Sequence, residues 1–330
     1  MTTARTSLLR PVLLLLCATA LGSKNNAPAS SLIEQARHLS DIRTEGAPPF
    51  QLRMSFRVIQ RSGIATEGVY KEVWISKAQW RRETEIGAFR RIEVGMGRKR
   101  WLLDSSTVIP EHIGEIPHLF EFGSFPGKWK SAKDREINGV SARCIEQKSD
   151  LGFSALCFAK ANGAIVAEFR PWLLSTRIGE RACSYSDYEK YGDRMFATSY
   201  QCDEDKRPFL QARTVELIAA PATQDSSLFA PPNGAKESLN CLDSIEPPKV
   251  LSAPNLPPPT RSFTGTVLVL VSTVIGTDGR THNLRVTSEP RQPFDETALA
   301  TVRQWRFMPG SCGGEPMETE IFVQVAFTHY

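Results

Sequence analysis

The chain has 330 residues, of which 41% are hydrophobic and 23% are charged, so it is long and apolar enough to bury the cores of two ordinary domains. This composition excludes a wholly disordered chain, a collagen-like repeat and a membrane protein with many spans. The formal net charge is +4, and it falls to +2 once a leader containing Arg5 and Arg10 is removed. A near-neutral chain gives no electrostatic reason to expect nucleic acid as a partner.

The N-terminus has the pattern of a secretory signal peptide, and we assign residues 1–22 to it. Its apolar run, 11–22 (PVLLLLCATALG), is shorter than the ~20 residues that cross a bilayer. Small residues then allow cleavage after Ala20, Gly22 or Ala29. We therefore expect an exported, periplasmic protein. The alternative is an inner-membrane protein that an uncleaved N-terminal segment anchors.

Six of the seven cysteines follow this leader, and an even number in an exported chain favours disulfides. Two of them lie on consecutive strand-like runs, and two flank a compact unit further on. The last two lie in the linker and in the last domain. No CxxC pair or Cys/His cluster offers a metal site, and we expect no cofactor. The layout predicts three disulfides: Cys144–Cys157, Cys183–Cys202 and Cys241–Cys312.

A proline-rich stretch divides the chain. Residues 219–259 contain nine of the 22 prolines and show little apolar periodicity. Such a composition is typical of a semi-rigid, extended linker between domains. We therefore expect an N-terminal domain at 31–218 and a C-terminal domain at 260–330.

The N-terminal domain begins with a predicted helix and continues as a series of strands. Residues 31–43 have apolar side chains at helical spacing, with a serine available to cap the helix. Segments with mostly alternating apolar and polar residues follow at 50–58, 68–75, 78–86, 89–96 and 99–103, and later at 139–148, 154–160, 164–170 and 211–218. Alternation of this kind predicts an antiparallel sheet with one covered face. The expected fold class is therefore α+β.

This order of elements resembles the curved, half-open antiparallel sheet of periplasmic lipoprotein carriers of the LolA/LolB-like group. The resemblance rests on the strand order and the leading helix, and not on a residue motif. It implies a half-barrel whose concave apolar face holds an acyl chain or a segment of a partner. The alternative is a closed core filled by the tryptophans of this domain: Trp74, Trp80, Trp101, Trp129 and Trp172.

The last seventy residues predict a small β-β-α-β domain. A long β-branched strand at 265–276 is followed by the Asp-Gly turn of 277–280, and the chain returns at 283–288. A helix is expected at 294–305, with acidic residues in its first turn and basic residues in its last. The closing strand runs over about 317–328.

This segment resembles the C-terminal domain of TonB-family proteins over 263–328. The matching residues are Gly265, Val267, Val269, Gly279, Val286, Ser288, Pro290, Phe294, Asp295, Ala298, Val302, Trp305, Arg306, Phe307, Pro309, Gly314 and Pro316. The resemblance implies a periplasmic domain that binds a short extended peptide of an outer-membrane transporter. The peptide adds as a strand to the exposed sheet edge by the closing strand.

Two departures from the family pattern limit what the resemblance implies. Energised members keep a membrane helix with a histidine, whereas no histidine precedes His38 here. The usual residues ahead of the first strand are replaced by 255–263 (NLPPPTRSF). We therefore expect partner binding, and not coupling to a proton-driven motor.

The closing strand carries the predicted binding residues. Its residues 321, 323, 325 and 327 share one face, which we expect under the helix, and Phe322, Gln324 and Ala326 share the other. The main-chain edge here is our candidate site for an extended peptide of an envelope partner, or for a second copy of the domain in a homodimer. The alternative is an edge already covered by a linker strand that the Cys241–Cys312 disulfide holds in place.

Three other patterns suggest chemistry but have simpler interpretations. Residues 111–121 hold two histidines and three carboxylates, yet Gly114 and Pro117 oppose an aligning helix, so we expect a solvated loop. The arginines between 81 and 100 could meet anionic lipid headgroups or an acidic partner, but such residues are more often the solvated faces of strands. The segment 277–282 is explained by its hairpin turn.

Sequence motifs of enzymes are absent: there is no nucleophile elbow, no HExxH and no phosphate-binding loop. Two hypotheses from different classes remain. The first is an envelope adaptor that binds a peptide through the C-terminal domain, in a process such as outer-membrane transport. The second is a carrier of lipid or lipoprotein that uses the N-terminal half-barrel.

Overall fold

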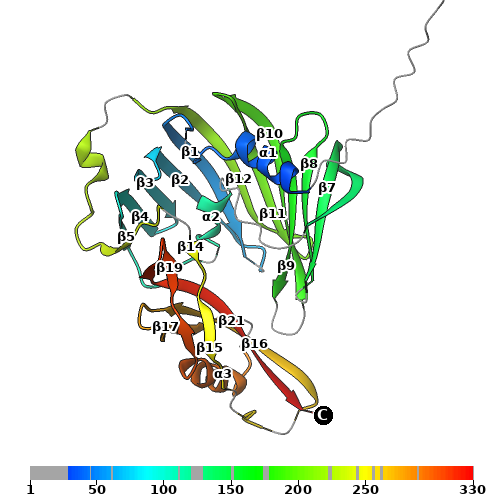
Figure 1. Cartoon of the computed structure of the whole chain (residues 1–330), viewed down its shortest axis with the longest axis vertical. Helices are drawn as coiled ribbons and strands as arrows, with labels where there is room; N and C mark the ends of the chain where they lie inside the picture. Colours follow the sequence, from blue (N-terminus) through cyan, green and yellow to red (C-terminus); the bar gives the residue numbers. More distant parts are fainter. Residues whose placement is uncertain are drawn as a thin grey trace, which may run out of the picture.

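The computed structural model describes residues 29–329, apart from 45, 61, 111, 120–128, 150–151, 174–177, 222–224, 243–244, 255–256, 261–262 and 288–289. The assigned signal peptide lies outside these residues. The described chain forms a large curved sheet with a smaller α+β domain below it (Figure 1). This arrangement confirms the predicted fold class.

The large sheet is antiparallel throughout and has thirteen strands in the order β13-β5-β4-β3-β2-β1-β12-β11-β10-β9-β8-β7-β6 among the described residues. Its strands in chain order are β1 (Phe50–Ile59), β2 (Ala65–Ser76), β3 (Gln79–Ile86), β4 (Phe89–Met96), β5 (Lys99–Asp104), β6 (Lys130–Ile137), β7 (Val140–Ser149), β8 (Gly152–Ala159), β9 (Ile165–Leu173), β10 (Ile178–Tyr191), β11 (Arg194–Glu204), β12 (Arg207–Ala219) and β13 (Lys236–Leu239). Its two end strands, β13 and β6, do not pair with each other, so the sheet is not a closed barrel, and Figure 1 shows that it is curved.

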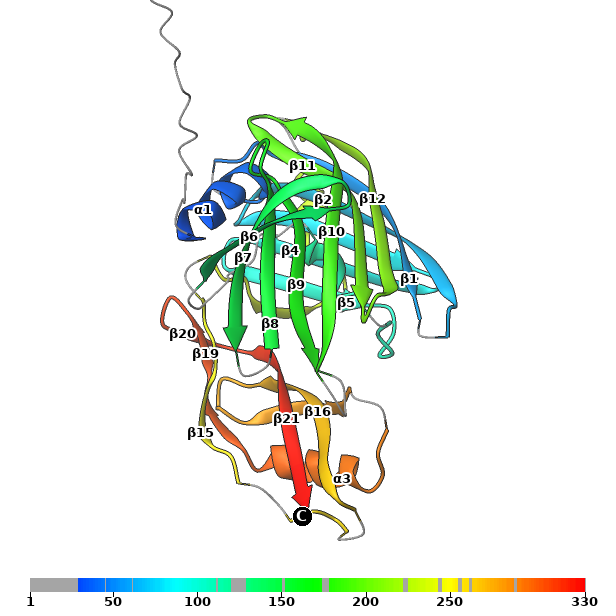
Figure 2. The same cartoon turned by 90° about the vertical axis from the view of Figure 1, so that its right-hand side faces the viewer.

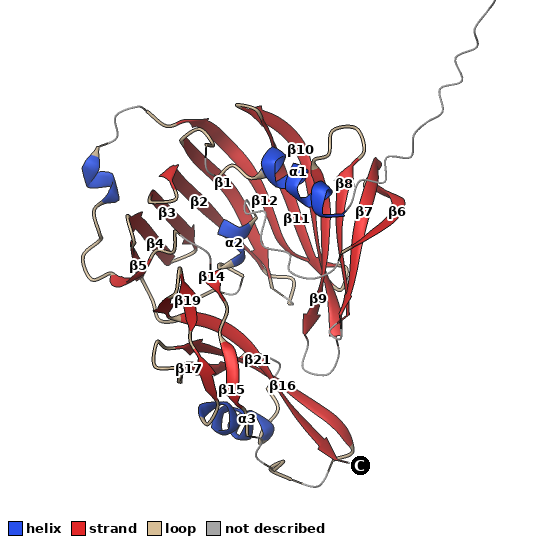
Figure 3. Cartoon of the chain, in the orientation of Figure 1, coloured by secondary structure: helices blue, strands red, loops and turns tan. Residues whose placement is uncertain are grey.

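Two helices cover the concave face: α1 (Ala29–Ser40) and α2 (Glu115–His118) (Figures 1 and 3). Strict alternation along β1 turns its apolar side chains, from Phe50 to Val58, toward this face. Ile33 and Ala36 of α1 pack against side chains of β7, β8 and β9. Ile113, Ile116 and Leu119 from the segment around α2 pack against β1 and its neighbours. The concave face is therefore an apolar core with a helical cover.

The linker is extended, but it is also bound to both domains. A 3₁₀ helix, η1 (Ser226–Phe229), buries Phe229 on the convex face against Ile92 and Val94. Strand β13 then pairs with β5 at the edge of the large sheet. Two further linker strands, β14 (Ile245–Glu246) and β15 (Lys249–Ser252), pair with the C-terminal domain. The proline-rich composition predicted the extended backbone but not these pairings.

The C-terminal domain contains a three-stranded antiparallel sheet in the order β17-β16-β21, and Figure 2 shows β21 and β16 side by side. Its main elements are β16 (Gly265–Ile275), β17 (Thr281–Val286), α3 (Phe294–Arg303) and β21 (Thr319–His329), which gives the predicted β-β-α-β order. Ala298 and Val302 of α3 pack on Val269 and Val325 of the sheet. Short strands that the sequence did not predict lie between α3 and β21: β18 (Arg306–Met308), β19 (Gly310–Cys312) and β20 (Glu315–Met317).

Four strands of the large sheet, β6, β10, β11 and the linker strand β13, have no counterpart among the predicted segments. The sequence of β10 (IGERACSYSDYEKY) has charged or hydroxylic residues at most positions, and Asp187 interrupts it with a φ of 54°. Its inward residues include Arg181 and Tyr185, so the apolar alternation that marks a half-buried strand is missing.

Three disulfides join the six described cysteines in the predicted pairs. Cys144 and Cys157 face each other across β7 and β8, with their Cα atoms 4.0 Å apart. Cys183 and Cys202 do the same across β10 and β11 at 4.1 Å. The third disulfide joins Cys241 of the linker to Cys312 of β19. It therefore ties the C-terminal domain to the segment that leaves the large sheet.

Candidate functional site: the edge of the C-terminal sheet

Strand β21 lies at an edge of the C-terminal sheet. It pairs with β16 along its whole length, from Gly265 opposite His329 to Ile275 opposite Thr319. Within the described parts of the chain, no strand pairs with its other side. Eleven residues of β21 thus present an unpaired main-chain edge.

The direction of the main-chain groups on β21 follows from one hydrogen bond on the neighbouring strand. The amide of Thr287 donates to the carbonyl of Leu270 at 2.9 Å, so this carbonyl points toward β17. In an antiparallel strand, the N–H and C=O of one residue point to the same side, and successive residues alternate. Leu270 is opposite Gln324, so the N–H and C=O of Gln324 point away from β16. The same alternation turns the groups of Phe322 and Ala326 outward.

The side chains of β21 divide as the sequence predicted. Val325 and Phe327 are 2% and 3% exposed and belong to the core under α3, and Ile321 and Val323 pack against that core. On the opposite face, Phe322 is 58% exposed, Gln324 is half-buried and Ala326 is exposed. The edge therefore offers outward main-chain groups beside the uncharged side chains of Phe322, Gln324 and Ala326.

The linker does not cover this edge among the described residues. Strand β14 pairs with β19, and β15 pairs with β18. The indole Nε1 of Trp305 donates to the carbonyl of Pro254 at 3.1 Å, which holds the end of the linker near the C-terminus of α3. The alternative of a linker strand paired with β21 is therefore not found.

The turn before β17 has the expected hairpin geometry. Gly279 has a φ of 73°, and its amide donates to the carbonyl of Gly276 at 2.9 Å. The carboxylate of Asp278 accepts from the amide of Arg280 at 2.9 Å, which lowers the pKa of this carboxyl. The Gly279 carbonyl accepts from the amide of Phe307, so the turn packs directly on β18.

A second notable site, which the sequence did not predict, lies inside the N-terminal domain. The Nε of Arg43, just after α1, donates to both carboxylate oxygens of Glu72 on β2, at 3.0 and 3.2 Å. The Nη1 of Arg43 donates to the carbonyl of Pro117 in α2 at 2.7 Å. Tyr70 and Arg82 complete the surroundings of Glu72. One buried guanidinium thus connects the segment after α1, the sheet and α2.

Electrostatics fix the charge of this buried carboxylate. Burial alone raises the pKa of Glu72, but the positive charges of Arg43 and Arg82 outweigh this effect, and the pKa is lowered overall. Glu93 on β4 shows the same balance, with Arg100 and Arg82 as the cations. Both carboxylates are therefore ionised within the fold at neutral pH.

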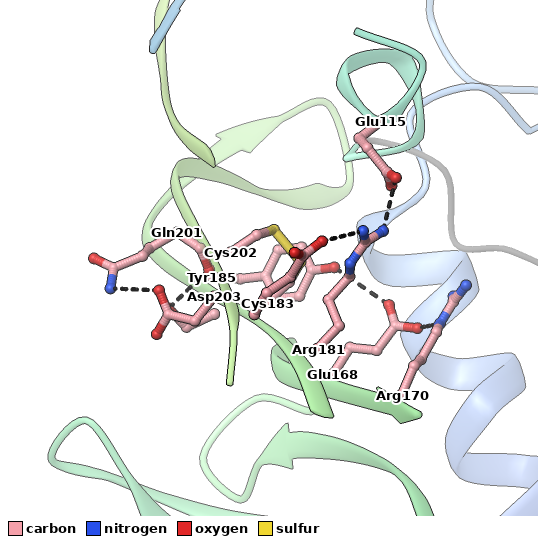
Figure 4. Close-up of a disulfide and its surroundings, with 11 residues drawn as sticks. Glu115, Glu168, Arg170, Arg181, Cys183, Tyr185, Gln201, Cys202 and Asp203 are labelled. Carbon is pink, nitrogen blue, oxygen red and sulfur yellow. Dashed lines mark hydrogen bonds and ion pairs between the residues drawn. A yellow bond between two sulfur atoms is a disulfide. The ribbon is translucent and has the colours of Figure 1, made fainter. Parts of the chain in front are cut away.

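A second set of polar side chains lies on the concave face, beside the Cys183–Cys202 disulfide (Figure 4). Arg181 on β10 bonds to Glu115 of α2 at 2.7 Å, and it also pairs with Glu204 of β11. Burial raises the pKa of the neighbouring Tyr185 to about 12, so this phenol stays neutral at physiological pH. Arg181 and Arg43 therefore hold α2 from two directions.

The described part of the histidine and carboxylate cluster, residues 112–119, does not form a solvated loop. Ile113 and Ile116 are buried in the core, and the His112 ring lies 4.4 Å from that of Phe209. Glu115 is bound to Arg181. Glu111 and Glu121 lie outside the described residues, and no group of metal-binding side chains occurs among the described ones. The apolar residues between the polar ones explain why the segment folds inward.

The arginines between 81 and 100 are matched by carboxylates and form no basic patch. Each has an acidic partner: Arg81–Glu83, Arg82–Glu72, Arg90–Glu83, Arg91–Asp104, Arg98–Glu315 and Arg100–Glu93. Cross-strand register explains two of these pairs, because Arg82 lies opposite Glu72 of β2 and Arg91 lies opposite Asp104 of β5. Attraction to an anionic surface is therefore not supported there.

The small domain, with one helix packed on an antiparallel sheet and an open edge, is the class of module that the sequence indicated. Residues 262–329 match the family model described as the Gram-negative bacterial TonB protein C-terminal. No curated protein matches the chain. None of the helices in the described residues is long and apolar enough to span a membrane.

Solved structures similar to the chain include LolA-superfamily proteins. A LolA superfamily protein from Nitrosomonas europaea is 14% identical, with a TM-score of 0.41, over 62% of this chain and 98% of its own. A DUF1329 family protein from Desulfovibrio piger is 10% identical, with a TM-score of 0.43, over 61% and 97%. The MucA/MucB complex of Pseudomonas aeruginosa gives 10% identity and a TM-score of 0.31, over 90% and 93%. At these scores the likenesses carry no argument about function.

Proposed function

We propose that the protein is a non-catalytic adaptor of the cell envelope that binds an extended segment of an envelope partner along the edge of β21. The observation that carries this proposal is the outward direction of the main-chain groups of Phe322, Gln324 and Ala326 on a strand with one described neighbour. An incoming strand satisfies these groups by β-augmentation. The match of 262–329 to the TonB C-terminal family supports this mode of binding.

The disulfides support an exported location. Cysteines pair and stay paired in oxidising compartments, and three disulfides in one chain are rare in a reducing cytosol. Together with the predicted signal peptide at 1–22, this favours the periplasm. A segment of an outer-membrane protein is then a partner that this edge could reach.

The experiment is capture of envelope proteins by the full mature chain and by two variants at one position. Gln324→Pro removes the outward N–H, and it should abolish capture while the fold remains intact. Gln324→Ala keeps the N–H and is the matched control, which should retain capture. Equal capture by a folded Gln324→Pro variant would contradict the proposal. If the wild-type protein self-associates and the Gln324→Pro variant does not, the strand that binds the edge of β21 is a second copy of the chain.

A second candidate function is favoured by the covered concave face. The apolar side chains Ile113, Ile116 and Leu119 occupy the face of the half-barrel, and displacement of the α2 segment would expose it to an acyl chain. This supports a carrier of lipid or lipoprotein as the alternative. Mass spectrometry of organic extracts of the purified protein tests it: bound lipid at a constant molar ratio favours the carrier, and its absence favours the adaptor.

A further inference from the structure

The convex face of the large sheet contains a hollow that neither proposed function uses. It has a volume of about 270 Å³ and lies over β2, β1, β12 and β11. Its lining consists of Ser55, Phe56, Arg57, Glu67, Ser199, Tyr200, Gln201, Gln211, Ala212 and Arg213. Phe56, Tyr200 and Ala212 are buried in the core on the other side of the sheet, so the floor of the hollow is a packed part of the fold.

Strand register explains why a hollow forms at this place. One row across the four strands reads Glu67, Arg57, Gln211, Gln201, and the next reads Val69, Ser55, Arg213, Ser199. The two rows share one face because their members are two residues apart along each strand. Two short serines beside longer side chains leave open space, with hydroxyl, amide and guanidinium groups at its rim.

The charges around the hollow are not balanced. Arg57 and Arg213 occupy diagonal positions on neighbouring strands, where long side chains reach each other. Arg57 lies 3.4 Å from Glu67, and both of these side chains are largely exposed. Among the described residues, Arg213 has no ion pair, and Ser55, Ser199 and Gln211 have no side-chain hydrogen bond. Among the lining residues, two guanidiniums and one carboxylate leave a net positive charge beside unused donors. The carboxylate of Asp203, which accepts from the side-chain amide of Gln201 at 3.2 Å, lies just outside the lining.

We propose that this hollow binds a phosphate ester group between Arg57 and Arg213. An oxyanion placed there relieves the repulsion between the two guanidiniums and accepts hydrogen bonds from both. The hydroxyls of Ser55 and Ser199 donate to further oxygens of the same group. The volume exceeds that of a phosphate alone, so part of the esterified group also fits. The phosphate could come from a soluble ester or from a phospholipid headgroup.

The test is calorimetric titration of the full mature protein with sn-glycerol 3-phosphate, together with sedimentation of the protein with phosphatidylglycerol or phosphatidylcholine vesicles. Saturable binding of the soluble ester is expected, and Arg213→Ala should weaken it at least about tenfold, as for loss of a charge-assisted hydrogen bond. Ser199→Val fills the hollow without removing a charge and should cause a similar loss. Arg53→Ala, on the same face of β1 but outside the hollow, is the matched control and should bind as the wild type does.

The outcomes separate the two sources of phosphate. Binding of the ester without sedimentation on phosphatidylglycerol vesicles assigns the hollow to a soluble phosphate ester. If the protein sediments with phosphatidylglycerol vesicles, and Arg213→Ala abolishes this while Arg53→Ala does not, the hollow binds a phospholipid headgroup. Absence of both kinds of binding in the wild type overturns the proposal. Equal losses in Arg213→Ala and Arg53→Ala also overturn it, because they indicate attraction to charge without a site.

Discussion

Arg43 and Glu72 form an ion pair inside the N-terminal domain, where 6% of the arginine side chain and none of the glutamate side chain is exposed. The arginine stands in the segment that follows α1, and the glutamate points from β2 into the concave face. The bond from Arg43 to the carbonyl of Pro117 extends this pair to α2. The helical cover is thus attached to the sheet by charge as well as by apolar contact.

Replacement of Arg43 by methionine should strongly destabilise the N-terminal domain. The change leaves Glu72 buried with one cation fewer, and breaking a buried ion pair costs about 3–5 kcal/mol. Urea unfolding followed by tryptophan fluorescence measures the loss. Arg37→Ala, in the more exposed pair with Glu34, is the control and should change stability by less than about 1 kcal/mol. Equal small effects of both changes would show that the ion pair contributes little.

Stability should decline in acid because Glu72 and Glu93 have lowered pKa values. A lowered pKa means that the unfolded chain binds more protons than the folded chain. The stabilisation from these two carboxylates is therefore complete above the pKa of a glutamate in the unfolded chain, ~4.3. This stabilisation is lost as the pH falls through the pKa values of the two carboxyls in the folded protein. Thermal unfolding at a series of pH values should show a stable plateau above about pH 5 and a steep fall below it. Glu93→Gln removes one of these protonation sites, and a fall as steep as that of the wild type would contradict the assignment.

Gly279→Ala should destabilise the C-terminal domain more than Gly314→Ala does. Both glycines have positive φ, at 73° and 86°, so each alanine is strained. A Cβ at position 279 would lie 2.1 Å from the carbonyl oxygen of Phe307, whereas one at 314 meets nothing within 4 Å. We expect about 1 kcal/mol for Gly314→Ala from backbone strain alone and clearly more for Gly279→Ala. Calorimetry of the two variants provides the comparison.

Asn240→Ala should loosen the linker from the large sheet. The side-chain amide of Asn240 donates to the carbonyls of Lys77 and Gly97, at the turns of two adjacent hairpins, at 3.1 and 2.8 Å. Its loss removes two hydrogen bonds made by a buried side chain and should cost about 1–3 kcal/mol locally. Faster limited proteolysis within 219–259 is the expected result. Ser238→Ala on exposed β13 is the control, and equal cleavage of both variants would show that Asn240 does not hold the linker.

Local patterns were sufficient for much of the fold and for the edge site. The alternation of Phe50 to Val58 is sufficient to predict β1, and the residues around Trp305 are sufficient to predict the C-terminal module. The assignment of Phe322 and Gln324 to one face needed only a period of two. These features depend on residues close together in the chain.

Features that depend on distant partners were not predictable in this way. Arg43 and Glu72 are 29 positions apart, and neither residue lies in a pattern that marks it as buried. The hollow between Arg57 and Arg213 exists only because β1 and β12 are neighbours with a particular register. Strand β10 was missed because the polar partners of Arg181 and Tyr185 make a charged inward face stable.

The three disulfides differ in how much of the chain must be present before each can close. Cys144–Cys157 and Cys183–Cys202 span 13 and 19 positions between neighbouring strands, whereas Cys241–Cys312 spans 71. Closing the longer loop costs more chain entropy, and its second cysteine, Cys312, follows all the other cysteines along the chain. The two short crosslinks can therefore form while the chain is still emerging, and the mutual placement of the two domains becomes covalent last.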